Sequence, residues 1–126
     1  MAHTVCLIRG DGIGPEVTAA AQRVIEASGV KIDWIDLPAG AGAVEEYGKV
    51  LPTHTIDQID RHKVALKGPV TTPIGKGFKS VNVQLRMRLN LYSAIRPVRS
   101  IEGVKTRYEG VDLVVFRENT EGLYSG

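Results

Sequence analysis

Apolar residues in the first half of the chain form short runs, separated by longer stretches in which they recur at helical spacing. The runs predict three strands, at Thr4–Ile8, Lys31–Leu37 and Val64–Leu66. Consecutive apolar positions, as in Thr4–Ile8, are typical of a strand buried in a parallel sheet. Strands that alternate with helices in this way predict an α/β fold with a parallel sheet.

A helix is predicted between the first two strands. Gly14-Pro15-Glu16 suits its first turn, because proline loses no hydrogen bond there and glutamate interacts well with the helix dipole. We expect the helix to end at Gly29. Its apolar stripe, which should face the sheet, consists of Val17, Ala20, Ala21, Val24 and Ile25.

Two more stretches precede the third strand. Pro52 and Thr53 introduce residues with helical spacing that continue to His62. Gly40–Gly48 is rich in glycine and alanine and fits either a short helix or a loop.

The central stretch, Gly68–Arg96, begins with glycines and prolines and then becomes helical, with Ser80 as a candidate N-cap. Two apolar sets follow at near-helical spacing: Val83, Met87 and Leu91, and Leu85 and Leu89. Leu91–Val98 and Val111–Phe116 then predict strands, the second buried because it is apolar and β-branched. The polar residues 101–110 predict a loop.

Composition excludes several classes of protein. The formal charge of +2 is too small to favour nucleic acid or an anionic membrane as a partner. No apolar run reaches membrane-spanning length and no secretory signal is recognisable, so a cytoplasmic protein is expected. Cys6 is the only cysteine and is predicted to be buried in an apolar strand. The three histidines lack metal-ligand spacing.

The central stretch also brings basic side chains near hydroxyls and an amide. A hydroxyl-rich loop that leads into a helix N-terminus is typical of an anion site. Arg86 shares a helix face with Asn82 at i, i+4 spacing. Arg96 lies in a predicted strand, and Arg117 follows another strand at its carboxyl end, where α/β sheets bind ligands. Guanidinium groups bind carboxylates as forks, so a small ligand with several carboxylates is expected.

Each of these residues also has a structural alternative. Ser80 could do no more than cap its helix, and Arg96 could be a salt-bridged strand residue. Arg117 and Glu118 could form an exposed ion pair, worth less than ~1 kcal/mol. Tyr124 could be an ordinary half-buried aromatic residue. Asp11, in the loop after the first strand, is expected to be structural, as is Glu16.

Three motifs, spread from Ile8 to Gly126, resemble the β-decarboxylating dehydrogenases and specifically the isocitrate dehydrogenases. They are IRGDGIGPEV, KGPVTTPIGKGFKSVNVQLRMRLNLYSAIRPVRS and RENTEGLYSG. The first motif contains three glycines, Gly10, Gly12 and Gly14. Gly14 comes one position too early for the dinucleotide-binding fingerprint G-x-G-x-x-G.

The resemblance implies a parallel-sheet α/β core of the isocitrate/isopropylmalate dehydrogenase type, incomplete at the C-terminus. Residues 1–98 would be the N-terminal part of the large domain, and 99–126 the beginning of the small substrate and dimerisation domain. The implied reaction is the NAD- or NADP-dependent oxidative decarboxylation of isocitrate to 2-oxoglutarate. The family's catalytic lysine, metal-binding aspartates and adenine-binding loop would lie downstream, so this chain alone is not expected to be active.

The resemblance also assigns roles to residues. Those that would bind substrate are Ser80, Asn82, Arg86, Arg96 and Arg117. Tyr124 would give a proton to the enol carbon, with its pKa lowered by nearby arginines. Thr71 and Thr72 would approach the nicotinamide part of NAD or NADP, with Asn82 beside them. The Mg²⁺ or Mn²⁺ ligands would lie outside this chain, in an enzyme that is a homodimer or a higher homo-oligomer.

Several alternatives stay open. Ser80 and Asn82 favour a third carboxylate over the alkyl group of isopropylmalate, so isocitrate comes first, homoisocitrate second and tartrate-like diacids third. The second class of function that stays open is a non-catalytic, carboxylate-binding regulatory subunit of the same fold. The choice between NAD and NADP is not determined by these residues.

Overall fold

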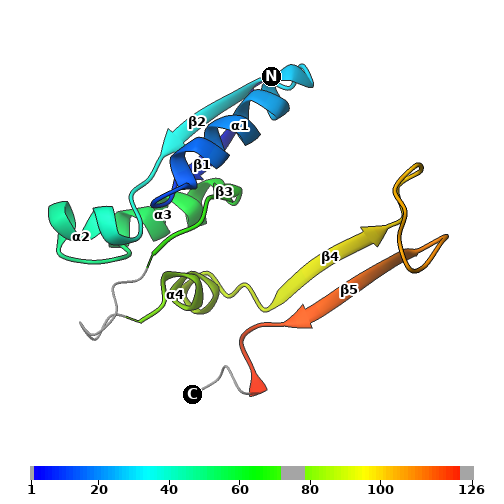
Figure 1. Cartoon of the computed structure of the whole chain (residues 1–126). Helices are drawn as coiled ribbons and strands as arrows, with labels where there is room; N and C mark the ends of the chain where they lie inside the picture. Colours follow the sequence, from blue (N-terminus) through cyan, green and yellow to red (C-terminus); the bar gives the residue numbers. More distant parts are fainter. Residues whose placement is uncertain (1, 72–78, 123–126) are drawn as a thin grey trace. The chain divides into compact units, whose positions relative to one another are not determined.

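The computed structural model (Figure 1) describes residues 2–71 and 79–122. The chain divides into two compact units, Met1–Leu85 and Arg86–Gly126. The domain boundary predicted at residues 98 and 99 concerns the whole protein and stays a prediction.

A three-stranded parallel sheet forms the centre of the first unit. Its strands are β1 (His3–Ile8), β2 (Ile32–Asp36) and β3 (Ala65–Lys67), in the order β2-β1-β3 (Figure 1). Cys6 of β1 pairs with Ile35 on one side and Ala65 on the other. The three predicted strands and their parallel arrangement are therefore confirmed, and no start or end differs by more than one residue.

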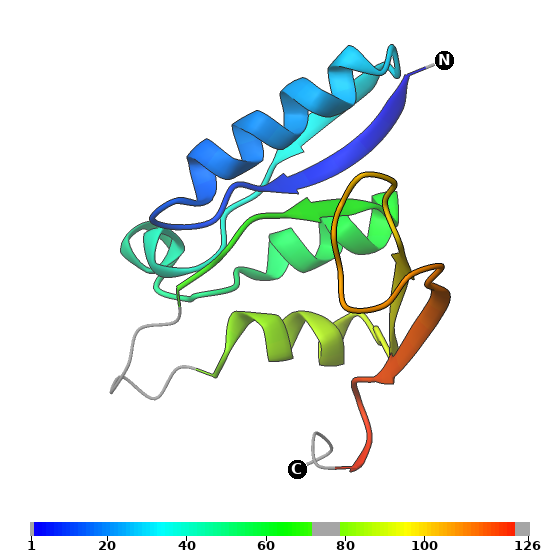
Figure 2. The ribbon, with the colours of Figure 1, turned by 45° about the vertical axis from the view of Figure 1, so that its right-hand side comes forward.

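Three helices connect the strands: α1 (Gly14–Ala27), α2 (Ala41–Tyr47) and α3 (Thr53–His62). The two crossovers run in opposite directions across the sheet, so right-handed connections place α1 and α3 on opposite faces, as Figure 2 shows. The stretch that fitted either a helix or a loop is the helix α2, which ends at Gly48 in the left-handed conformation.

The core of this unit lies around β1. Cys6 and Leu7 are fully buried and Ile8 is nearly so, because β1 has a strand on each side and a helix on each face. The predicted burial of Cys6 is confirmed, and this burial raises the pKa of its thiol.

The predicted apolar stripe of α1 is wrong in part. Val17 and Val24 are exposed, and the buried residues of the helix are Gly14 and Thr18. Thr18 replaces an apolar residue because its hydroxyl donates to the Gly14 carbonyl at 2.8 Å, which satisfies the only polar group of the side chain. A Cβ on Gly68 would lie 2.7 Å from the Thr18 methyl, so the helix packs closely on the chain after β3.

The helix α4 (Val81–Arg88) begins directly after Ser80, whose carbonyl accepts a hydrogen bond from Gln84 N–H at 2.9 Å. Ser80 thus occupies the N-cap position, as predicted. Of the two predicted apolar sets, Leu85 is buried together with Val81, whereas Val83 and Met87 are exposed.

A turn that the sequence analysis did not predict ends α4. Leu91 N–H donates to the Arg86 carbonyl at 2.8 Å, and Asn90 N–H donates to the Met87 carbonyl at 3.4 Å. Asn90 has φ +51°. This pair of bonds around a left-handed residue is a Schellman motif. Leu91 belongs to this turn, so the strand predicted from Leu91 begins two residues later.

The second unit contains an antiparallel hairpin of β4 (Ser93–Arg99) and β5 (Asp112–Glu118), joined by the loop predicted at residues 101–110. The strand predicted at Val111–Phe116 is confirmed as part of β5, but its predicted burial is wrong. Phe116 is 68% exposed, and its partner Ile95 is 61% exposed. The β-branched run forms a strand because each backbone group finds a partner in β4, and this pairing does not require burial.

Among the described residues, no helix combines the length and the apolar character needed to cross a membrane.

Candidate functional site

Arg96 and Arg117 lie on the same face of the β4–β5 hairpin. Arg96 pairs with Val115, and Arg117 pairs with Ala94. Residues directly opposite each other in an antiparallel pair share a face, and so do residues two positions apart. The two arginines are therefore diagonal neighbours, whose Cα atoms are expected to be roughly 7–8 Å apart.

The position of Arg117 differs from the prediction. It was expected just beyond a strand's carboxyl end, but it lies within β5 and takes part in the strand register. The register is what fixes its side chain on the same face as Arg96. The other face carries Arg99, which forms an exposed ion pair with Asp112 at 3.0 Å.

Asn82 and Arg86 are half-buried and lie one turn apart on α4, as their spacing predicted. Ser80 is exposed at the start of the same helix. One helix therefore carries a hydroxyl, an amide and a guanidinium group within two turns, and Arg86 near its C-terminal end also interacts favourably with the helix dipole.

The turn after β5 is organised by Glu118. Its carboxylate accepts hydrogen bonds from Thr120 N–H at 2.7 Å, the Thr120 hydroxyl at 2.8 Å and Glu121 N–H at 2.7 Å. The backbone hydrogen bond from Thr120, followed by that from Glu121, lowers the pKa of Glu118. Glu118 was predicted only as a possible ion-pair partner of Arg117, so its role in this turn was missed.

Asn119 connects the same turn to the residues before β4 by hydrogen bonds. Its backbone N–H donates to the Tyr92 carbonyl at 3.0 Å, and its Nδ2 donates to the Leu91 carbonyl at 3.5 Å. Asn119 as a whole residue is 6% exposed. The turn after β5 is therefore anchored to the residues that precede β4.

Asp11 connects three segments of the first unit. Its carboxylate accepts hydrogen bonds from the N–H groups of Thr71 at 2.7 Å, Ala41 at 3.0 Å and Gly42 at 3.3 Å. The expectation that Asp11 is structural is confirmed by these contacts. Thr71, a predicted cofactor residue, is exposed and has its backbone held by this carboxylate.

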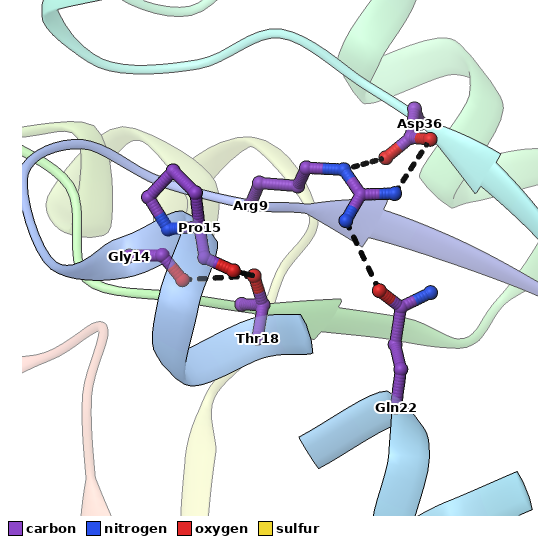
Figure 3. A network of polar contacts seen from close by, with 6 residues as sticks. All are labelled: Arg9, Gly14, Pro15, Thr18, Gln22 and Asp36. Carbon is purple, nitrogen blue, oxygen red and sulfur yellow. Dashed lines mark hydrogen bonds and ion pairs between the residues drawn. The ribbon is translucent and has the colours of Figure 1, made fainter. Parts of the chain in front are cut away.

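A second polar network joins the carboxyl ends of β1 and β2. Arg9 binds Asp36 as a fork, with its Nε at 2.8 Å and its Nη2 at 3.0 Å, and its Nη1 donates to Gln22 Oε1 at 3.1 Å (Figure 3). A cavity of about 250 Å³ lies beside this network, between residues 9–11 and residues 36–43. The sequence analysis did not predict the network, because its partners are far apart along the chain.

Two of the predicted site residues, Thr72 and Tyr124, lie outside the described part of the chain. Within residues 2–71 and 79–122, no three histidine, cysteine, aspartate or glutamate residues are grouped so that they could hold a metal ion. The described residues therefore do not fit a metal centre.

Comparison with known proteins agrees with this geometry. The family model described as isocitrate/isopropylmalate dehydrogenase matches residues 4–126. The chain belongs to this family. A mitochondrial protein of Drosophila melanogaster named as a probable NAD isocitrate dehydrogenase subunit alpha is 49% identical over 124 residues, which are 97% of this chain and 32% of the relative. An NADP isocitrate dehydrogenase of Haloferax volcanii is 45% identical over 95% of this chain and 30% of the relative.

A solved structure gives the same result for the fold. The crystal structure of isocitrate dehydrogenase from Methylococcus capsulatus is 52% identical, with a TM-score of 0.87 over 98% of this chain and 37% of that chain. The predicted α/β fold of the isocitrate/isopropylmalate dehydrogenase type is thereby confirmed. This chain spans about a third of the length of the curated family members it matches.

Proposed function

We propose that this chain supplies the substrate-binding part of an isocitrate dehydrogenase, an oxidoreductase that oxidatively decarboxylates isocitrate to 2-oxoglutarate with NAD or NADP. The observation that carries the proposal is the shared hairpin face of Arg96 and Arg117. The names of family members 45% and 49% identical to the chain support it.

The residues fit a tricarboxylate by their charge and geometry. Two guanidinium groups on one sheet face can each bind one carboxylate as a fork, and their fixed strand register holds the forks apart at a set distance. By the family resemblance, the substrate site would also include Arg86, Asn82 and Ser80. A substrate held at several carboxylates is oriented before reaction, which removes much of the entropic cost of the chemical step.

The remaining roles follow from the family resemblance. Thr71 and Thr72 would contact the nicotinamide end of the cofactor, which accepts the hydride when bound. Tyr124 would donate a proton to the carbon left after loss of carbon dioxide. The divalent metal, the homodimer and a cytoplasmic location belong to the same proposal, although family members from mitochondria are also similar to this chain.

Calorimetric titration of the chain with isocitrate tests the anion site. Binding should weaken by at least about tenfold in Arg96→Ala and in Arg117→Ala, because a hydrogen bond to a charged group contributes about 1.5–3 kcal/mol. Arg99→Ala is the matched control, since Arg99 lies on the same strand but on the opposite face. Equal weakening in all three variants would count against the shared face as the site.

A chimera tests the reaction. Residues 1–126 are joined to the remaining two thirds of the Methylococcus capsulatus isocitrate dehydrogenase, and reduction of NAD and of NADP is followed by absorbance. The chimera should oxidise isocitrate in preference to isopropylmalate, and the 126-residue chain alone should not. An inactive chimera that still binds isocitrate would favour a carboxylate-binding regulatory subunit. A preference for isopropylmalate would overturn the assignment of isocitrate as the substrate.

A further inference from the structure

The carboxylate of Asp11 makes its shortest hydrogen bond with the backbone of a proposed cofactor residue. Its Oδ2 lies 2.7 Å from the Thr71 nitrogen, compared with 3.0 Å from that of Ala41, and its Oδ1 lies 3.3 Å from that of Gly42. A hydrogen bond to an ionised acceptor is shorter and stronger than a neutral one. The closest of the three contacts is the one with Thr71, sixty residues away in the sequence.

The surrounding backbone is shaped to admit this carboxylate. A Cβ on Gly40 would lie 2.1 Å from Asp11 Oδ2, and a Cβ on Gly10 would lie 1.9 Å from the Pro69 carbonyl oxygen. Both glycines have positive φ, +89° and +84°. In addition, Asp11 N–H donates to the Pro69 carbonyl at 2.8 Å. Asp11 is thus tied to residues 69–71 by both its backbone and its side chain.

We propose that Asp11 is a positioning residue for the cofactor, because it fixes the backbone of Thr71 at the start of the Thr71-Thr72 pair. This inference rests on the proposed function, in which the two threonines contact the nicotinamide end. Asp11 acts through Thr71 and not on the reacting atoms.

A purely local role, in which Asp11 only caps α2, explains less. That helix has seven residues, and its two N–H groups make the longer contacts with Asp11. A cap for α2 would not require a bond to Thr71, nor the close approach of residues 10 and 69. The geometry points to the Thr71 segment as the part that Asp11 holds in place.

Amide hydrogen exchange in the 126-residue chain tests the contact without any activity. Asp11→Asn keeps the shape of the side chain, but the one acceptor oxygen that it retains is uncharged, so a hydrogen bond from Thr71 N–H loses its charge assistance. Exchange at Thr71 should become at least about tenfold faster in Asp11→Asn, which corresponds to about 1.4 kcal/mol. The control is Asp57→Asn, because Asp57 is an exposed carboxylate on α3. This variant should leave the exchange rate at Thr71 unchanged. Unprotected exchange at Thr71 in the unchanged chain would overturn the proposal.

Kinetics of the chimera separate positioning from a general loss of structure. With Asp11→Asn, kcat/KM for the cofactor should fall by roughly ten- to a hundredfold, because a misplacement of about 1 Å near the reaction costs on the order of 10²-fold. The KM for isocitrate should change by less than about twofold, since Asp11 does not hold the arginines, and kcat/KM in Asp57→Asn should be unchanged.

The two proposals fail in different ways. Suppose that the chimera is active and that Asp11→Asn changes the kinetic constants for the cofactor and for isocitrate equally, or changes neither. This result would overturn the role of Asp11 while leaving the proposed function intact. An unaltered chimera that lacks activity would overturn the proposed function, and the exchange at Thr71 would then decide whether Asp11 holds that segment.

Discussion

Glu118 accepts hydrogen bonds from both the backbone N–H and the hydroxyl of Thr120, at 2.7 and 2.8 Å, within the turn that follows β5. These bonds favour the ionised carboxylate and lower the pKa of Glu118 in the folded chain. A group with a lowered folded pKa stabilises the fold at pH above its unfolded pKa. This stabilisation is lost as the pH falls through the lowered value.

The first prediction concerns this turn. Thr120→Val removes the hydroxyl donor but keeps the backbone donor, so the pKa of Glu118 should rise toward the usual glutamate range without reaching it. The pKa of Glu118 in the unchanged chain and in Thr120→Val is measured by NMR, from the chemical shift of its carboxyl carbon during an acid titration. A higher midpoint in the unchanged chain than in Thr120→Val would contradict the assigned hydrogen bonds.

The second prediction compares two glycines of one loop. Gly12 has φ +58° and open space where a Cβ would lie, so Gly12→Ala should cost only the backbone strain of about 1–2 kcal/mol. Gly10→Ala adds a collision with the Pro69 carbonyl, so its total cost should be about 2–5 kcal/mol. Urea unfolding followed by the fluorescence of Trp34, the only tryptophan, measures both. Similar midpoints for the two variants would mean that residues 10 and 69 are not in close contact.

The third prediction concerns the end of α3. Lys63 has φ +65° and donates its backbone N–H to the Ile59 carbonyl at 2.7 Å. Both Lys63→Gly and Lys63→Ala remove the exposed ion pair with Asp60. The difference in the free energy of unfolding between the two variants therefore reports the backbone conformation at residue 63. Lys63→Gly should be more stable than Lys63→Ala by about 1 kcal/mol, because only glycine adopts this conformation without strain. The same urea titration measures the difference, and a more stable alanine variant would refute it.

The fourth prediction concerns Cys6. Its side chain is fully buried, and burial raises the pKa of its thiol, whereas the thiolate is the reactive form. Alkylation by iodoacetamide should therefore be at least about 10²-fold slower in the folded chain than in denaturant, since folded domains open rarely. Stability should also decrease as the pH rises above the unfolded thiol pKa toward the raised value. Alkylation at equal rates with and without denaturant would show that the β1 core is open.

Much of the first unit could be predicted from the sequence because its elements are determined by local patterns. The apolar run of Thr4–Ile8 predicts a buried strand whatever its partners are, and Pro15 and Pro52 mark helix starts by their fixed φ. The spacing of Asn82 and Arg86 likewise predicts a shared helix face before any packing is known.

The misses arise where distant parts of the chain decide the outcome. Thr18 faces the sheet because Gly68 leaves room for it, and no property of residues 14–27 alone shows this. The pairing of Ala94 with Arg117 requires the strand register, which the apolar pattern of β5 does not specify. The role of Asp11 depends on donors thirty and sixty residues away.

The exposed apolar pair of Ile95 and Phe116 has a consequence for how the chain denatures. A two-stranded ribbon is at best marginally stable in water, whereas β1 is enclosed by neighbours on every side. Heating should therefore melt residues 93–118 before residues 3–67, in two calorimetric steps. A single enthalpy of unfolding would not describe this chain.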